Sequence, residues 1–201
     1  MKILIVPTVR EIYKKQFEYS VDLRLISFLK NIFTVSFIEI YNKTMRKDHN
    51  LIVFAGGNNS ITQIQADRLR NKINNSIYKI AMKKKIKMIG ICHGAHFLAK
   101  KNGLTLGRAK NHTKPHKVFF NIDNNKFRKN VNSFHNEIIK LKKNKIINIF
   151  GKAEDNTVEA FHIKKKNILG IMWHPERYNK IKYFDKQLIN KFYATNSIIG
   201  R

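Results

Sequence analysis

The feature that most constrains the fold is an apolar run that ends in the chain's single cysteine, between two glycines. Residues 87–91 are typical of a buried parallel strand, and residues 95–100 are typical of the start of a helix. Cys92 is therefore predicted at a sharp strand-to-helix turn, where Gly90 and Gly94 relieve crowding. The helix N-terminus would favour the thiolate, which makes Cys92 a candidate nucleophile. The alternative is a buried structural cysteine.

A second motif lies 82 residues after Cys92 and carries the groups that a cysteine nucleophile needs. Residues 167–172 predict a strand, which leads into Trp173, His174, Pro175 and Glu176. A histidine can accept the thiol proton and return it to a leaving amine, while a carboxylate fixes the histidine's tautomer. The two motifs together predict a triad of Cys92, His174 and Glu176, and they favour the catalytic interpretation of the cysteine.

The order of these motifs resembles the class I glutamine amidotransferase domain. Residues 131–135 (Val-Asn-Ser-Phe-His) and 154–160 (Glu-Asp-Asn-Thr-Val-Glu-Ala) resemble segments of its γ-glutamyl hydrolase branch. The resemblance, which runs from about residue 50 to residue 178, implies the triad above and an oxyanion hole made by the backbone N–H groups of Gly57 and His93. The substrate-binding residues that it implies are Gly56, His96, Asn132, Ser133, Phe134 and His135.

The paired glycines 56 and 57 support the same interpretation from the residues alone. They follow a strand predicted over residues 51–55. Glycines allow the backbone to come close to a ligand and to turn an amide toward it, as an oxyanion hole requires. A tight turn without a function is the alternative.

Two departures from the family pattern concern the substrate. His96 stands four residues after the nucleophile, where amidotransferases that use free glutamine usually carry Gln, and Asn136-Glu137 replace the His-Gln that is common in the hydrolase branch. Both positions fall near the expected glutamyl pocket, so they change the hydrogen bonds that select the substrate and leave the triad intact.

The resemblance implies a small-molecule γ-glutamyl conjugate as substrate, with a nucleotide-linked, anionic leaving group. The first alternative is a glutaminase subunit that supplies ammonia to a separate synthase, a partner that the hydrolase does not require. The others are a hydrolase of another γ-glutamyl amine and a catalytically silent binding module.

A polar loop is predicted over residues 8–19, after a first strand over residues 2–6. In a parallel sheet such a loop lies over the carboxyl ends of the strands, where ligands bind. Arg10, with Tyr13, Lys14 and Lys15, is therefore a candidate contact for an anionic substrate, although for each residue taken singly an ordinary surface position is the favoured interpretation.

The formal net charge of +27, from 40 Lys and Arg against 13 Asp and Glu, raises the question of nucleic-acid binding. The lysine runs at 83–85, 140–145 and 164–166 are scattered and mostly lack interleaved aromatic residues, which favours solvated faces, then attraction of an anionic small substrate. No nucleic-acid partner is expected. Because the sequence has no long apolar run and no signal peptide, we expect a cytoplasmic protein that does not bind a membrane.

The expected fold is a single α/β domain over residues 1–201, with a doubly wound, mostly parallel central sheet, helices on both faces and a small antiparallel C-terminal section. Besides the strands named above, we expect strands over 33–40, 117–122, 127–131, 138–142 and 146–152, and a hairpin of 158–163 with 168–173. Helices are expected over 20–32, over 62–85 with a break near residues 74–75 and a cap at Ser60 or Thr62, and over 181–193.

The segment from residue 103 to 115 is predicted to be irregular. It contains His112, the first of two histidines that could form a metal-binding motif. His112 and His116 have a spacing that is compatible with a metal, but no Cys, Asp or Glu lies nearby in the sequence as a third ligand. We therefore expect neither a metal nor a cofactor.

Overall fold

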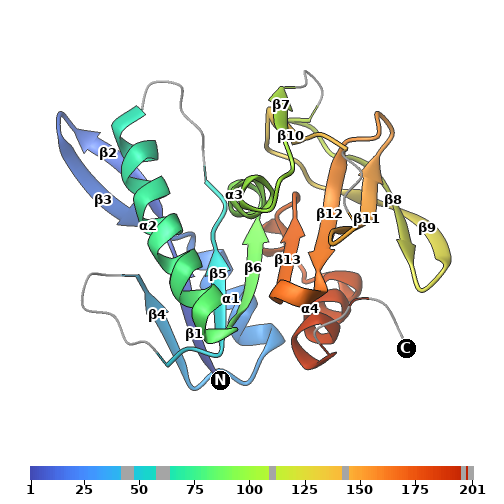
Figure 1. Ribbon diagram of the computed structural model, residues 1–201, viewed down its shortest axis with the longest axis horizontal. Coiled ribbons are helices and arrows are strands. Elements are labelled where there is room, and N and C mark those ends of the chain that lie inside the picture. Colours follow the sequence, from blue (N-terminus) through green and yellow to red (C-terminus); the bar gives the residue numbers. More distant parts are fainter. Residues whose placement is uncertain (42–47, 58–63, 109–111, 142–144, 196–197, 199–201) are drawn as a thin grey trace.

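The structure is a computed structural model in which residues 1–41, 48–57, 64–108, 112–141, 145–195 and 198 are described (Figure 1). The predicted cap at Ser60 or Thr62 lies outside these residues. Among the residues described, no helix is long and apolar enough to cross a membrane.

Within the described ranges, eleven strands form one mixed sheet in the order β4-β1-β5-β6-β13-β12-β11-β8-β9, with β10 and β7 beside β12. The parallel part consists of β4 (Phe37–Ile40), β1 (Lys2–Val6), β5 (Leu51–Phe54), β6 (Lys87–Ile91) and β13 (Ile168–Ile171). The antiparallel part consists of β12 (Val158–Ile163), β11 (Asn148–Ala153), β8 (His116–Ile122), β9 (Asn125–Val131), β10 (Glu137–Ile139) and β7 (Leu106–Arg108). The predicted fold class is confirmed.

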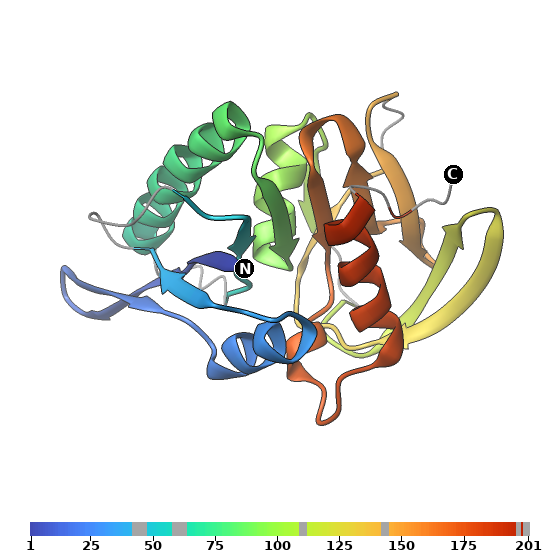
Figure 2. The same cartoon turned by 90° about the horizontal axis from the view of Figure 1, so that it is seen from below.

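Helices cover both faces of the parallel strands (Figure 2). On one face, α1 (Leu23–Ile32) and α4 (Tyr183–Thr195) pack with Ile3, Ile5 and Val53, while on the other α2 (Ile64–Lys84) and α3 (His93–Lys101) pack with Leu4 and neighbouring residues of β5. Successive strand side chains point to opposite faces, so strands that are apolar at every position require a helical layer on each side. Two short 3-10 helices, η1 (Lys164–Lys166) and η2 (Pro175–Arg177), follow β12 and β13.

The loop predicted over residues 8–19 is wrong, because this segment is a β-hairpin of β2 (Thr8–Tyr13) and β3 (Gln16–Ser20). Phe17 and Tyr19 alternate with polar residues, and Tyr19 pairs with Val9, which is buried; this alternation is the signal for a strand that was missed. Lys15 takes a left-handed conformation with φ of 64° at the tip.

The break predicted in the second helix is also wrong, since α2 continues through residues 74 and 75. Asn75 donates its side-chain amide to the carbonyl of Asn71 at 2.7 Å, one turn back, while Asn74 is buried. The side-chain bond lies along the helix and does not replace its backbone bonds, so the helix tolerates the pair.

The remaining predictions hold with shifted ends. The hairpin of β12 and β13 is confirmed, β4 is shorter than residues 33–40, and the segment predicted to be irregular contains β7. The first helix begins later than predicted because Asp22 caps it, accepting a hydrogen bond from the N–H of Arg24 at 2.9 Å. That the chain is a single domain stays a prediction.

Candidate active site

Cys92 lies between β6 and α3 with φ of 49° and ψ of −106°, a conformation that side-chain-bearing residues rarely adopt. Its N–H donates to the carbonyl of Ile171 at 2.8 Å, and its carbonyl accepts the first α3 bond from His96 at 3.0 Å. The turn has no space for larger neighbours, because a Cβ at Gly94 would lie 2.1 Å from the carbonyl oxygen of Phe54. The predicted strand-to-helix turn is confirmed, and Cys92 is 3% exposed at the N-terminus of α3, the positive end of the helix.

His174 and Glu176 follow β13, the strand that pairs with β6, so both motifs end at the same edge of the sheet. Nδ1 of His174 lies 2.5 Å from Oε1 of Glu176, and both side chains are buried. Burial disfavours the imidazolium, but hydrogen bonds with Cys92 and Glu176 outweigh burial and raise the pKa of His174 to about 9. The three predicted triad side chains are therefore in contact.

Asn132 positions His174 through both ends of its side-chain amide. Its Oδ1 accepts from the N–H of His174 at 2.8 Å, and its Nδ2 donates to the carbonyl of His174 at 2.8 Å. The backbone N–H of Asn132 donates in turn to the hydroxyl oxygen of Tyr178 at 2.9 Å. The Asn132 amide, which was predicted to contact substrate, thus holds the backbone of His174 just after β13.

The peptide that joins Gly56 to Gly57 is fixed on its carbonyl side. The carbonyl of Gly56 accepts from Oγ1 of Thr8 at 2.8 Å and from Nη2 of Arg70 at 3.1 Å. In a trans peptide the N–H points opposite to the carbonyl, so these bonds direct the Gly57 N–H away from Thr8 and Arg70. The N–H of His93, at the first turn of α3, lacks a helical partner and is the second available donor.

Arg70 is a site residue that sequence reasoning missed. It lies on α2, is 2% exposed, and donates from Nη2 to the carbonyl of Ala55 at 2.6 Å as well as to that of Gly56. Burial lowers its pKa to about 10, while the neighbouring Cys92 and Asp67 act in the opposite direction. The only sequence signal is an arginine on the apolar face of a helix.

A cavity of about 240 Å³ opens on one side of Cys92. Its lining comprises Gly57, Cys92, His93, His96, Arg108, Phe134, His135, Asn136 and Glu137. Burial, with His135 nearby, lowers the pKa of His96 to about 4, and burial also lowers the pKa of His93. Nε2 of His96 lies 3.1 Å from the carbonyl oxygen of Glu137, which favours the tautomer with the proton on Nε2.

A second cavity of about 250 Å³ opens on the side of His174. Gly57 lines both cavities, and Gly56, Arg10, Arg177 and Glu176 belong to the second. The structure therefore brings Arg10 near His174, although the segment that carries Arg10 is a strand. Tyr13, Lys14 and Lys15 lie exposed at the far end of the hairpin.

The segment after β9 divides its predicted substrate residues between the cavity and the protein interior. Phe134 is 53% exposed, packs 5.6 Å from the ring of His174 and lies 4.9 Å from the guanidinium of Arg177. Ser133 is buried and donates its hydroxyl to the carbonyl of His112. His135 is also buried but lines the first cavity, with Nδ1 2.8 Å from the carbonyl oxygen of Glu137.

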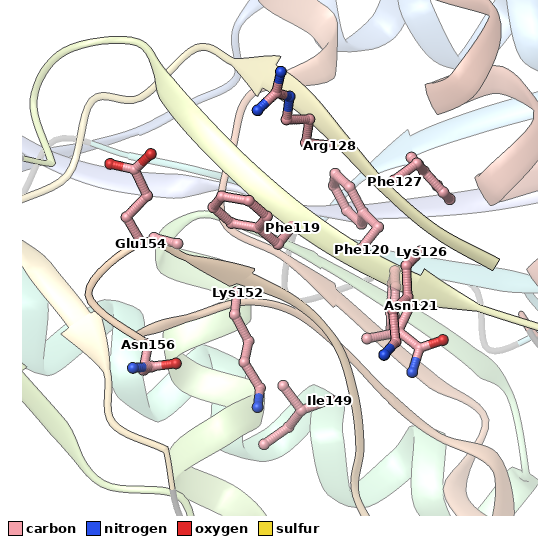
Figure 3. A pocket seen from close by; sticks show the side chains of 12 residues that line it. Phe119, Phe120, Asn121, Lys126, Phe127, Arg128, Ile149, Lys152, Glu154 and Asn156 are labelled. Carbon is pink, nitrogen blue, oxygen red and sulfur yellow. The ribbon is translucent and has the colours of Figure 1, made fainter. Parts of the chain in front are cut away.

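A wider hollow of about 670 Å³ lies over β8, β9 and β11, where charged side chains surround Phe119 and Phe120 (Figure 3). It shares no lining residue with the two cavities beside the triad. The hollow is therefore separate from the two cavities that Cys92 and His174 line.

Comparison with known proteins finds a matching family over most of the chain. The model of the family "Glutamine amidotransferase class-I" matches residues 12–195. A γ-glutamyl-CDP-amidate hydrolase from Campylobacter jejuni is 35% identical over 130 residues, which cover 64% of this chain and 62% of the relative. This chain thus spans less than two thirds of that relative's length.

Two crystal structures share the fold. A Thermoplasma acidophilum protein described as one component of a GMP synthase has a TM-score of 0.71 and 19% identity, with 96% of this chain and 92% of that chain covered. A glutamine amidotransferase from Thermotoga maritima has a TM-score of 0.67 and 18% identity, with 94% and 81% covered.

Proposed function

The chain belongs to the class-I glutamine amidotransferase family, and from this premise we propose that it hydrolyses γ-glutamyl amides with Cys92 as nucleophile. One observation carries the proposal: Cys92 is held in a strained turn at a helix N-terminus and hydrogen-bonds to His174, which is paired with Glu176. A buried structural cysteine requires neither the strained conformation nor the paired histidine.

In the proposed reaction the Cys92 thiolate attacks the γ-carbonyl carbon, and the N–H groups of Gly57 and His93 stabilise the oxyanion. The His174 imidazolium donates its proton to the leaving nitrogen as the C–N bond breaks, which leaves a γ-glutamyl thioester. Water then gives a proton to His174 and attacks the thioester, which releases glutamate and returns the thiolate. Glu176 holds the imidazole orientation throughout.

The two cavities support one orientation of the substrate. Cys92 lines the first, His174 lines the second, and Gly57 lines both. A scissile bond above Gly57 places the acyl group in the first cavity and the leaving nitrogen beside His174. This is the arrangement that protonation of the leaving group requires.

The first cavity has the charges that a glutamyl group needs. Arg108 offers a guanidinium for the α-carboxylate, and Glu137 offers a carboxylate for the α-ammonium. Neutral His96, with its proton on Nε2, lines this cavity at the position where amidotransferases that use free glutamine usually carry Gln.

For the leaving group we propose cytidine diphosphoramidate, so that the substrate is γ-glutamyl-CDP-amidate and the context is synthesis of capsular polysaccharide phosphoramidate. The relative from C. jejuni supports this substrate. Arg10 and Arg177 line the second cavity, where a diphosphate would lie, and the exposed ring of Phe134 beneath Arg177 offers a stacking surface for a base.

The test is glutamate release from a panel of γ-glutamyl conjugates that includes γ-glutamyl-CDP-amidate, a neutral γ-glutamyl amide and glutamine. We expect the nucleotide conjugate to be hydrolysed with the highest kcat/KM, and Cys92→Ala to remove all activity. Efficient hydrolysis of glutamine alone would favour the ammonia-supplying role. No hydrolysis of any member, with no alkylation of Cys92 at neutral pH, would contradict the enzymatic function.

A further inference from the structure

A second buried group of titratable side chains lies outside the triad. It consists of Glu159 on β12, His116 at the start of β8, His112 just before β8, and His135 in the segment between β9 and β10. Glu159 is 1% exposed, and His112 and His135 are 4% and 5% exposed. The reaction proposed above uses none of these four side chains as an acid, a base or a nucleophile.

The inward-facing atoms of this group lie around a single carboxylate oxygen. Oε1 of Glu159 is 3.3 Å from Nδ1 of His112, 3.4 Å from Nε2 of His116 and 3.8 Å from Nε2 of His135. Atoms of His112, His135 and Glu159 lie within 4.8 Å of one another. A tetrahedral zinc with bonds of about 2.0–2.1 Å separates its ligand atoms by roughly 3.3 Å, which the distances from Oε1 to His112 and His116 match, whereas His135 has to move closer.

The opposite nitrogen of each imidazole already has an acceptor. Nε2 of His112 lies 2.9 Å from Oδ2 of Asp155, Nδ1 of His135 lies 2.8 Å from the carbonyl oxygen of Glu137, and Nδ1 of His116 lies 3.2 Å from that of Lys114. A proton on each outer nitrogen leaves a lone pair on the inner one. Metal-binding histidines are oriented in this way by carboxylates and backbone carbonyls.

The inner atoms have no other hydrogen bonds to satisfy them. Among the residues that the structure describes, Nδ1 of His112, Nε2 of His116, Nε2 of His135 and Oε2 of Glu159 are buried without a hydrogen-bond partner of good geometry. Three unsatisfied imidazole nitrogens around Oε1 of Glu159 are costly unless a cation lies between them and the carboxylate.

We propose that His112, His116, His135 and Glu159 bind one divalent transition metal, best Zn²⁺. Three imidazoles and one carboxylate complete a tetrahedral set, which makes the site structural because no position is left open for a reacting water. The metal would fix His135 and, through the Glu137 carbonyl, the wall of the glutamyl cavity. The sequence expectation of no metal considered only neighbours of His112 and His116, whereas the fold supplies ligands from residues 135 and 159.

The test measures Zn²⁺ binding to the full chain carrying Cys92→Ser, because the active-site thiol could itself bind zinc. After removal of metal with a chelator, Zn²⁺ is titrated against a chromogenic competitor, and Co²⁺ is added separately to record the visible absorption of a tetrahedral complex. His112→Gln and Glu159→Gln remove ligands, while Asp155→Asn removes only the orienting carboxylate. His49→Gln is the control, since His49 is also buried and pairs with a carboxylate, Glu39, at 2.9 Å.

We expect one Zn²⁺ per chain, an affinity reduced about 10–100-fold by Asp155→Asn, a larger loss in the two ligand variants, and no change in His49→Gln. Absence of stoichiometric binding, or equal affinity in all four variants, would overturn the proposal in favour of a metal-free cluster with a protonated imidazole. Because Asp155 is half exposed, its variant keeps the test decisive if Glu159→Gln does not fold.

Discussion

Replacement of Gly57 by alanine tests the oxyanion hole, because the structure shows which atoms an added Cβ at this residue would meet and at what distances. A Cβ at residue 57 would lie 2.4 Å from Nη1 of Arg70 and 2.8 Å from Oγ1 of Thr8. Both atoms belong to groups that hold the Gly56 carbonyl, so relief of the clash moves the peptide that carries the Gly57 N–H. The absence of a positive φ at Gly57 means that space, and not backbone strain, requires glycine here.

Loss of one oxyanion donor costs about 2.7–4 kcal/mol of transition-state stabilisation, so kcat of Gly57→Ala should fall about 10²–10³-fold. The assay is kcat and KM for glutamate release, with the melting temperature and alkylation of Cys92 as checks on the fold and on the nucleophile. Gly107→Ala is the matched control, since its Cβ would lie 2.5 Å from Cε of Lys140, a flexible side-chain end that can move away. A Gly57→Ala enzyme with near wild-type kcat would show that the hole is built elsewhere.

Three further results are expected. Cys92→Ser should fold and lose more than about 10³-fold in kcat, and a smaller loss would argue against a covalent intermediate. His174 should titrate near pH 9 by NMR in the wild type. Because its folded pKa lies above the ordinary 6.5, the stability that protonated His174 contributes is complete below pH 6.5 and is lost as pH rises through about 9. Urea midpoints of the wild type and His174→Gln, compared across this pH range, would reveal the loss. Arg10→Ala should raise KM for a nucleotide conjugate and leave KM for a neutral γ-glutamyl amide unchanged; equal increases in KM for both substrates would assign Arg10 to the fold. Wild-type binding of the nucleotide conjugate should weaken as the screening length falls from about 10 Å at 0.1 M salt to about 3 Å at 1 M.

The sequence predicted those parts of the site that local pattern determines. An apolar run before Cys92 and another before His174 specify two buried strands, and parallel pairing of β6 with β13 then places both residues at one edge of the sheet. The role of the glycines around Cys92 could also be predicted from local sequence, because a sharp turn packed against a neighbouring strand leaves no space for a Cβ, whatever the rest of the fold contains.

The sequence could not predict contacts between segments that meet only in the folded chain. Arg70 meets the end of β5 because α2 crosses that face, and nothing beside residue 70 in the sequence indicates two distant carbonyls. Glu159 likewise meets His112 and His135 through strand pairing on the antiparallel side of the sheet. The hairpin over residues 8–20 is a different case, since its alternation is visible in the sequence but its many polar side chains favour a loop.

The charges around Cys92 explain why a buried arginine is tolerated at this site. Burial lowers the pKa of Arg70 to about 10, and the nearby Cys92 opposes this shift, so the guanidinium stays charged at neutral pH and favours a negative sulfur. The imidazolium of His174, which contacts Cys92, also favours a negative sulfur, and the carboxylate of Glu176 offsets the positive charge of the imidazolium. Because Arg70 also holds the carbonyls of Ala55 and Gly56, one side chain supports the thiolate and the proposed oxyanion donor together. Arg70→Met should therefore reduce both the alkylation rate of Cys92 and kcat, whereas a merely structural arginine would change the melting temperature and leave the alkylation rate of the folded protein unaltered.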